Sequence, residues 1–321
     1  YIIIFMIVND TAKNFLNFII KYIFIVYVFY FNIKSNYDLK RYLTYYCNIV
    51  FVLCCLSLIL YFLGYICNLL PINYNIVLNW GNTKIIGSIF NLQFIIQKEN
   101  FLGAILIRNT GVFCEAPMYM LNLVLCLTLN LFYIKTSKIN IIILIFGIIT
   151  TFSSTGYIML IIIFLLYIIS NKKMNLKILI IPIVLISSLF IISNIIESKS
   201  TTRSYSVRYD DYVASIKAWK KNIIFGNGYK QNDEFLNNIS SFRNTNKGQS
   251  SSIGAVLSQG GLFMLILYFI SFWKIYKFNE KSKYFAIVYL ILFVLVVFQY
   301  TAVELFILSI SINLNNKLKM S

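Results

Sequence analysis

The residues in this sequence that are best suited to bind phosphate are its few arginines. The chain contains five, and four of them lie in two polar stretches, residues 71–117 and 196–252: Arg108, Arg203, Arg208 and Arg243. A planar guanidinium can hold phosphate oxygens through paired hydrogen bonds, and it stays charged at every relevant pH. The set of four therefore predicts a diphosphate-binding site. For any single arginine, contact with lipid phosphates is the simpler alternative.

Proton transfer in this chain falls to a carboxylate, because the sequence contains no histidine. That absence excludes His-ligated zinc, Ser-His-Asp triads and imidazole bases. Glu115 directly precedes an apolar run, where a charged group is costly and needs a reason, so it is a candidate functional residue. A simple pair between Glu115 and Arg108 is the alternative. The acidic pairs Asp210-Asp211 and Asp233-Glu234 lack the spacing of a metal site, so we expect neither a metal ion nor a cofactor.

The composition indicates an integral membrane protein. Of 321 residues, 59% are hydrophobic and 12% are charged, and the mean hydropathy is +0.77. Soluble domains have about half apolar and about a quarter charged residues, so a bilayer is the solvent that fits this chain. We predict an all-α, polytopic fold that forms a single transmembrane domain over residues 1–321.

About ten membrane helices are predicted from the apolar runs. One is the short run at Tyr1, which we interpret as the remainder of an N-terminally truncated region. The other nine runs are Phe15–Ile33, Leu43–Cys67, Met118–Ile134, Ile139–Phe152, Gly156–Ser170, Ile178–Ile195, Ile253–Trp273, Tyr284–Tyr300 and Ala302–Leu314. Several are shorter than the roughly 20 residues that a span needs, so we expect tilted helices or helices that extend into the loops.

The charges of the short connections predict the orientation of the chain. Basic residues cluster in four of them: Lys34, Lys40 and Arg41; Lys135 and Lys138; Lys172, Lys173 and Lys177; Lys274, Lys277, Lys281 and Lys283. The positive-inside rule places these connections in the cytoplasm. The two long loops at 71–117 and 196–252 then face outward. Cytoplasmic anchoring also accounts for half of the basic residues behind the net charge of +17, which argues against nucleic-acid binding.

The second outward loop contains an amphipathic helix by its residue spacing. Apolar and aromatic side chains recur at helical intervals: Tyr209, Tyr212, Val213, Ile216, Trp219, Ile223 and Ile224. Such a helix could lie on a membrane surface. Gly226-Asn227-Gly228 ends it, and Gln231 in the third glycine position excludes a dinucleotide fingerprint. Between two apolar runs, Ser153-Ser154-Thr155-Gly156 predicts a tight turn, with a cavity-lining role as the alternative.

Four sequence elements, in this order, resemble bacterial O-antigen and capsular polysaccharide repeat-unit polymerases. The first element resembles the family's R-x-x-G-x-F-x-E-P element, with Ala116 inserted before Pro117, and reads RNTGVFCEAPMYMLNLVLCLTL. TTFSSTGYIML is similar to its Ser/Thr-rich helix junction. The third element is similar to the family's arginine-led loop helix and reads SVRYDDYVASIKAWKKNIIFGNGY. The fourth is similar to the helix after the large loop and reads SSSIGAVLSQGGLFMLILYF. Together they span Arg108 to about Phe269.

The resemblance implies an inverting, GT-C-like glycosyltransferase of a bacterial cytoplasmic membrane, with its active site on the outer face. It would move a growing glycan from an undecaprenyl diphosphate carrier onto the next lipid-linked repeat unit. Arg208 and then Arg108 are the first candidates to stabilise the leaving diphosphate, Arg203 or Arg243 completes the phosphate site, and Glu115 accepts the proton. A chain-length regulator is a further expected partner.

Two related activities are the alternatives to a polymerase. O-antigen ligases carry a functional histidine in the large loop, so the absence of histidine favours the polymerase branch. A flippase for lipid-linked oligosaccharide would use the same anionic substrate, but flippases usually place charge between two similar halves, and the sequence shows no internal repeat. A scaffold or chain-length regulator would have two spans, which does not fit about ten.

Overall fold

The computed structural model describes residues 19–80, 82–101, 104–171, 193, 203–243, 247–299 and 301–313. The chain divides into two compact units. One comprises Tyr1–Tyr42 with Thr201–Ser321, and the other comprises Leu43–Ser200. The run predicted at Tyr1, and the helix predicted over 178–195 apart from residue 193, lie outside the described residues. The single transmembrane domain stays a prediction.

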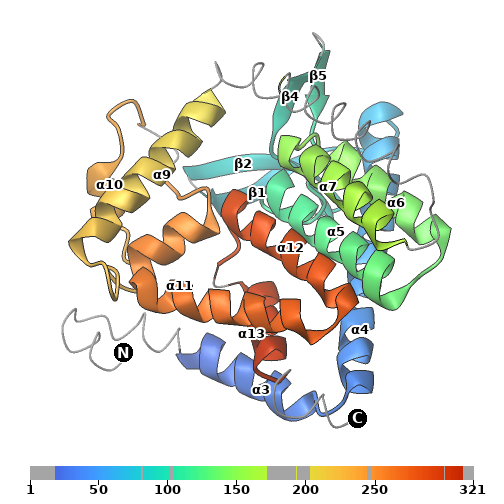
Figure 1. Cartoon of the computed structure of the whole chain (residues 1–321). Helices are drawn as coiled ribbons and strands as arrows, with labels where there is room; N and C mark the ends of the chain where they lie inside the picture. The colour runs from blue at the N-terminus through green and yellow to red at the C-terminus, as the bar shows by residue number, and fades with distance from the viewer. Residues whose placement is uncertain are drawn as a thin grey trace. The chain divides into compact units, whose positions relative to one another are not determined.

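Most of the described helices coincide with predicted apolar runs (Figure 1). In the unit of residues 43–200 they are α4 (Asn36–Tyr61, which begins in the other unit) with its π-helical extension η2 (Phe62–Ile66), α5 (Ala116–Leu129) with η3 (Asn130–Ile134), α6 (Lys138–Thr150) and α7 (Ser154–Ser170). In the other unit they are η1 (Ile19–Phe24), α3 (Ile25–Asn32), α9 (Arg203–Lys221), α10 (Asp233–Asn238), α11 (Ser252–Phe278), α12 (Glu280–Leu295) and α13 (Ala302–Asn313).

Three helical stretches among the described residues are long and apolar enough to cross a membrane: Asn36–Ile66, Ala116–Ile134 and Ser252–Phe278. α6, α7 and the stretch Ala302–Ile312 are apolar but shorter. These helices are consistent with the predicted membrane protein. The number of ten spans stays a prediction.

The all-α prediction is wrong for the first long loop. Five strands form there: β1 (Asn73–Trp80), β2 (Asn82–Ile89), β3 (Gln93–Ile95), β4 (Lys98–Phe101) and β5 (Ala104–Ile107). The first three form an antiparallel sheet in the order β1-β2-β3, and the last two form an antiparallel pair. The physical reason lies in the sequence between Asn73 and Ile89, which is rich in β-branched residues and also contains Tyr and Trp, the residue types that favour strands.

α11 and α12 form a tight helical hairpin. A single residue, Asn279, separates them, and its side chain accepts hydrogen bonds from the backbone N–H groups of Lys281 and Ser282 in a capping box. The lysines that predict a cytoplasmic connection are therefore gathered at this end of the hairpin. The N-terminal end of α11 and the C-terminal end of α12 lie at its opposite end.

α11 is broken at Gly261, whose φ of 61° and ψ of −162° do not belong to a helix. Four backbone hydrogen bonds of 2.8–3.0 Å join the two sides of the break to segment 223–228: Asn227 N–H to Ser258 C=O, Gly228 N–H to Gln259 C=O, Leu262 N–H to Ile223 C=O and Phe263 N–H to Ile224 C=O. The loop backbone thus replaces the hydrogen bonds that the helix loses. This pairing matters in a membrane helix, where water cannot supply the missing partners.

Two glycines allow the loop backbone to approach the break. A Cβ on Gly226 would lie 2.5 Å from the backbone nitrogen of Gly261, and a Cβ on Gly261 would lie 2.5 Å from the carbonyl oxygen of Ile224. Both glycines also have positive φ, a conformation that other residues adopt at a cost. No side chain larger than hydrogen fits at either position without moving the backbone.

Replacing Gly261 or Gly226 with Ala should therefore destabilise the fold by about 2–6 kcal/mol, since backbone strain and overpacking add. The measurement is the thermal unfolding midpoint of the purified protein in detergent. Gly248→Ala is the matched control, because a Cβ there meets nothing within 4 Å. Equal midpoints for the three variants would show that the close contact between loop and helix does not exist.

Candidate functional site

α9 carries the arginine-led loop sequence, and the predicted loop helix is confirmed. The buried side of α9 is small and polar: Val207, Asp210, Asp211, Ala214, Ser215 and Ala218. Phe235 of α10, itself 1% exposed, packs on Ala214 and Ala218. Small alanines permit this close approach of α10, and the carboxylates on the same side bind the loop that follows it.

Arg208 projects from α9 to the C-terminal end of α12. Its Nη1 donates a hydrogen bond of 3.2 Å to the carbonyl of Leu295, the last residue of α12. One turn along α9, the Tyr212 hydroxyl donates to the carbonyl of Val294 at 2.6 Å. The last carbonyls of a helix lack intrahelical partners and carry partial negative charge, so a guanidinium is stabilised there. Arg208 is half-buried, and within the described residues this is its one hydrogen bond.

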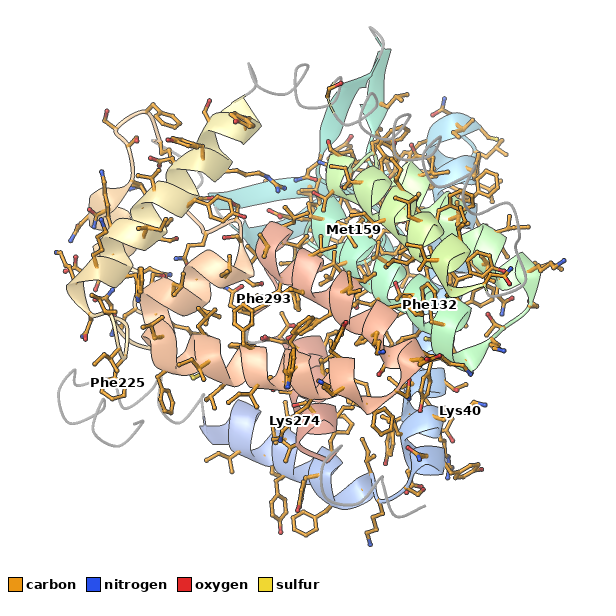
Figure 2. The ribbon with its side chains drawn as sticks, viewed as in Figure 1. Lys40, Phe132, Met159, Phe225, Lys274 and Phe293 are labelled. Atoms are coloured by element: carbon orange, nitrogen blue, oxygen red, sulfur yellow. The ribbon has the colours of Figure 1, made fainter. Side chains whose placement is uncertain are left out.

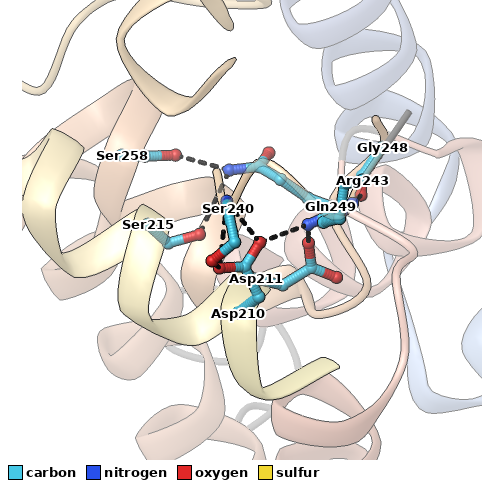
Figure 3. Close-up of polar contacts among 8 residues, drawn as sticks. All are labelled: Asp210, Asp211, Ser215, Ser240, Arg243, Gly248, Gln249 and Ser258. Atoms are coloured by element: carbon cyan, nitrogen blue, oxygen red, sulfur yellow. Dashed lines mark hydrogen bonds and ion pairs between the residues drawn. The ribbon is translucent and has the colours of Figure 1, made fainter. Parts of the chain in front are cut away.

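Arg243 lies at the centre of a buried ionic cluster (Figure 3). Its Nη1 forms ion pairs with Asp210, at 3.3 Å, and with Asp211, and its Nη2 donates to the carbonyl of Gly248 at 3.0 Å. Asp210 also accepts hydrogen bonds from the backbone and hydroxyl of Ser240. The cluster thereby ties both ends of segment 240–248 to α9.

The two carboxylates of this cluster have opposite pKa shifts. Burial raises the pKa of Asp210, but hydrogen bonds from Ser240 and Arg243 outweigh it, so its pKa lies below the ordinary value. Burial dominates at Asp211 and raises its pKa, even though Arg243 acts in the other direction. Asp210 is therefore the carboxylate whose charge the fold stabilises, and Asp211 is the one whose charge is costly to bury.

A second polar network joins this cluster to the break in α11. The Gln249 side-chain amide donates to Ser258 at 2.7 Å and to Ser215 at 3.4 Å (Figure 3). Gln259, beside the break, donates to Asn232 at 2.9 Å and accepts from the Lys230 backbone at 3.1 Å. Loop residues on both sides of α10 are thus held to the first part of α11 by side-chain amides.

The four predicted phosphate-binding arginines differ in their surroundings. Arg203 is the first residue of α9, and Arg208 reaches the end of α12. Arg243 is 2% exposed and its charge is matched by two carboxylates. This environment fits a role in holding the loop better than direct contact with phosphate. Arg108 lies in the other unit.

Arg108 begins a turn that α4, β3 and the end of α6 hold in place. Its Nε donates to the carbonyl of Thr151 at 2.9 Å, just past the end of α6. The next residue, Asn109, is fully buried and bonds Ser57 of α4, Gln93 of β3 and Thr150 of α6. The positive φ of Gly111 completes the turn, and its carbonyl accepts from Phe94 at 3.0 Å. Like Arg208, Arg108 therefore has a guanidinium positioned at the C-terminal end of a helix.

The Ser/Thr-rich junction is a tight turn, as predicted. α6 ends at Thr150 and α7 begins at Ser154, with Ser153 as the N-cap that accepts from the Gly156 backbone. Thr150 and Thr151 at this turn are the residues that bind Asn109 and Arg108. The structure thus brings together two of the motifs that are far apart in the sequence.

Glu115 is the N-cap residue of α5, with Pro117 following in the first turn. Its backbone is extended, its side chain makes no capping hydrogen bond, and it is half-buried. Among the described residues, no group of three or more Cys, Asp and Glu side chains could hold a metal ion, and metal independence stays a prediction.

Sequence reasoning missed the amides and hydroxyls that support the arginines: Ser57, Gln93, Asn109, Ser240, Gln249 and Gln259. Two signals were available. Asn-Thr-Gly after Arg108 is typical of a turn, and Gln259-Gly260-Gly261 inside an apolar run indicates a helix break. Ser57 and Gln93 carry no signal, because their partner is distant in sequence.

Comparison with known families supports the resemblance. The family model described as O-antigen ligase matches residues 139–253, from α6 to the start of α11. This range contains the Ser/Thr-rich junction and the arginine-led helix α9, while the element at Arg108 precedes it. The match supports this chain as a member of the superfamily of O-antigen ligases and polymerases. No curated protein and no solved structure matches the chain.

Arg243→Met should destabilise the loop by about 3–5 kcal/mol, because it leaves two carboxylates buried without their cation. The triple variant Asp210→Asn, Asp211→Asn, Arg243→Met should lose less, since it removes the charges together. Thermal unfolding midpoints in detergent measure both, with Lys247→Met as a control at an exposed loop position. A triple variant less stable than Arg243→Met would contradict the buried ionic cluster.

Proposed function

We propose that this chain is an inverting glycosyltransferase that polymerises lipid-linked repeat units. It transfers a growing glycan from undecaprenyl diphosphate to the next lipid-linked unit, at the outer face of a bacterial cytoplasmic membrane and without a cofactor. The observation that carries the proposal is Arg208, a half-buried guanidinium fixed at the end of α12 within the sequence range that matches the family.

The position of Arg208 along the hairpin supports an outward-facing site. Lys274, Lys277, Lys281 and Lys283 are gathered around the connection between α11 and α12, and the positive-inside rule assigns that connection to the cytoplasm. Arg208 contacts α12 at Leu295, the opposite end of the same helix. The charged diphosphate of a lipid in the outer leaflet lies at the same depth as this end of α12.

The chemistry requires a cation where the leaving group forms. The bond between the anomeric carbon and the phosphate oxygen breaks, the diphosphate leaves with the electron pair, and the acceptor hydroxyl oxygen bonds the anomeric carbon from the opposite face. Arg208 stabilises the leaving diphosphate, Arg203 lies on the same helix, and Arg108 is a further candidate cation from the sequence. The acceptor hydroxyl loses its proton to the Glu115 carboxylate. Arg243 holds the loop that presents Arg208.

Ligation is the second candidate function, because the matching family model is described as O-antigen ligase. Both reactions break the same bond and differ only in the acceptor. The absence of histidine in all 321 residues is what favours polymerisation here, since the related ligases use one in the large loop.

Deleting the gene should remove long surface glycans while single repeat units still reach the outer face. The measurement is the size profile of surface glycan and lipid-linked intermediates, compared with cells complemented by the wild-type gene. Long lipid-linked chains that are no longer attached to their final acceptor would identify a ligase. Repeat units trapped at the cytoplasmic face would identify a flippase and overturn the proposal.

Arg208→Gln should lower the rate of elongation by about 100-fold to 1000-fold, the usual effect of removing one preorganised donor. Glutamine is two bonds shorter than Nη1 of arginine, so the hydrogen bond to Leu295 is lost as well, and protein level and unfolding midpoint are measured together with the rate of elongation. Arg208→Lys should restore part of the rate, because it keeps the charge and loses the planar fork. Lys247→Gln is the matched control at an exposed position in the same loop. Wild-type elongation by Arg208→Gln would refute the assignment.

A further inference from the structure

We propose that the exposed side of α9, together with the segment that follows it, is a docking face for the membrane surface. The docking face consists of Tyr205, Tyr209, Ile216, Ile223, Ile224 and Phe225. Its members are 42–66% exposed although all are apolar or aromatic. The occupant we assign is the headgroup region of the same bilayer that α11 crosses.

The exposed and buried side chains of α9 are distributed differently from those of a helix whose outer side faces water. Tyr205, Tyr209 and Ile216 follow one another at intervals of four and seven residues, so they share one stripe of α9. The opposite side, with Asp210 and Ala214, is covered by segment 240–248 and by α10. A water-facing helix buries its apolar stripe and exposes polar side chains, whereas the exposed side of α9 carries aromatic rings and isoleucine beside its lysines, and two carboxylates lie on its buried side.

The docking face continues into the apolar surface of α11. Segment 223–225 is bonded to α11 at the break. The ring of Phe225, labelled in Figure 2, lies 6.0 Å from that of Phe263. Beyond the break, α11 exposes a row of large apolar side chains: Leu262, Phe263, Ile266, Leu267, Phe269, Ile270 and Trp273. These face lipid in a membrane helix, so the docking face is the edge of a surface that is already in the bilayer.

Charge and side-chain type both favour lipid as the occupant. Lys217 and Lys220 are exposed on α9 beside the stripe, which suits anionic headgroups. A sugar-binding surface combines aromatic rings with polar side chains that bond the hydroxyls, whereas half of the docking face is isoleucine. Isoleucine gains its free energy from burial in the acyl-chain boundary.

Docking would fix the depth of Arg208, which immediately precedes Tyr209 on α9. This consequence rests on the proposed function, because it places the guanidinium at the level of a lipid diphosphate. The docking itself does not, and it can be tested without any glycan.

Trp219, one turn after Ile216 on α9 and half-buried, is a native probe. The chain has 3 tryptophans, so the variant Trp80→Phe, Trp273→Phe leaves Trp219 alone. The full-length variant is placed in nanodiscs that contain anionic lipid. We expect strong quenching of Trp219 fluorescence by phospholipids brominated in the upper acyl chain, and weak quenching by aqueous acrylamide. Strong acrylamide quenching without bromolipid quenching would overturn the proposal.

Ile216→Asp with Ile224→Asp should reduce bromolipid quenching by at least about twofold, since charged residues withdraw the face from the interface. The unfolding midpoint in detergent should not change, because both side chains are exposed there. Lys247→Asp, on the same loop outside the docking face, should leave quenching unchanged. Protection of Trp219 from acrylamide by added oligosaccharide, without an effect of bromolipid, would show that the face binds sugar instead.

Discussion

Backbone groups that lack partners are costly wherever water is excluded, and the break in α11 places such groups in a membrane helix. Four of them are bonded by the backbone of segment 223–228. The loop and the helix therefore depend on each other, because neither Gly226 nor Gly261 can accept a side chain while the other keeps its place. The other described elements of the large loop are connected to this pairing of segment 223–228 with α11. α9 ends just before it, and α10 and the buried ionic cluster are built on α9.

Two arginines from different units share one type of environment. Arg208 bonds the last residue of α12, and Arg108 bonds the residue that follows α6. A helix C-terminus holds a guanidinium by charge as well as by hydrogen bonds, and one such bond uses only part of the fork of five donors. Arg243 shows the contrasting case, in which two carboxylates and a carbonyl satisfy the fork. Under the proposed function, the remaining donors of Arg208 are the ones that meet the ligand, whereas the pairing of Arg243 stabilises the protein.

The sequence predicted those parts of the fold that depend on local pattern. The helices α4, α5, α7 and α11 follow apolar runs, and α9 follows its spacing of aromatic and apolar residues. The strands between Asn73 and Ile107 were not predicted, because short strands contain no apolar run of bilayer length. The candidate arginines were visible as residue types. Their partners were not, because Ser57 meets Asn109 only through tertiary contacts and Arg243 meets Asp210 across 33 positions of chain.

The constraint at the helix break also bears on catalysis. A cation stabilises a leaving diphosphate only if it stands in place before charge develops, since reorganising it during the reaction would cost the energy that it contributes. An arginine on a loop of 57 residues, 196–252, would move too freely to meet this condition. The broken helix removes that freedom by making part of the loop a continuation of a membrane span. Arg208 then acquires the rigidity of α11 and α12, although it belongs to neither. Under the proposed function, a loop tied in this way can vary in its exposed segments to suit different sugars, while Arg208 keeps its place at the end of α12.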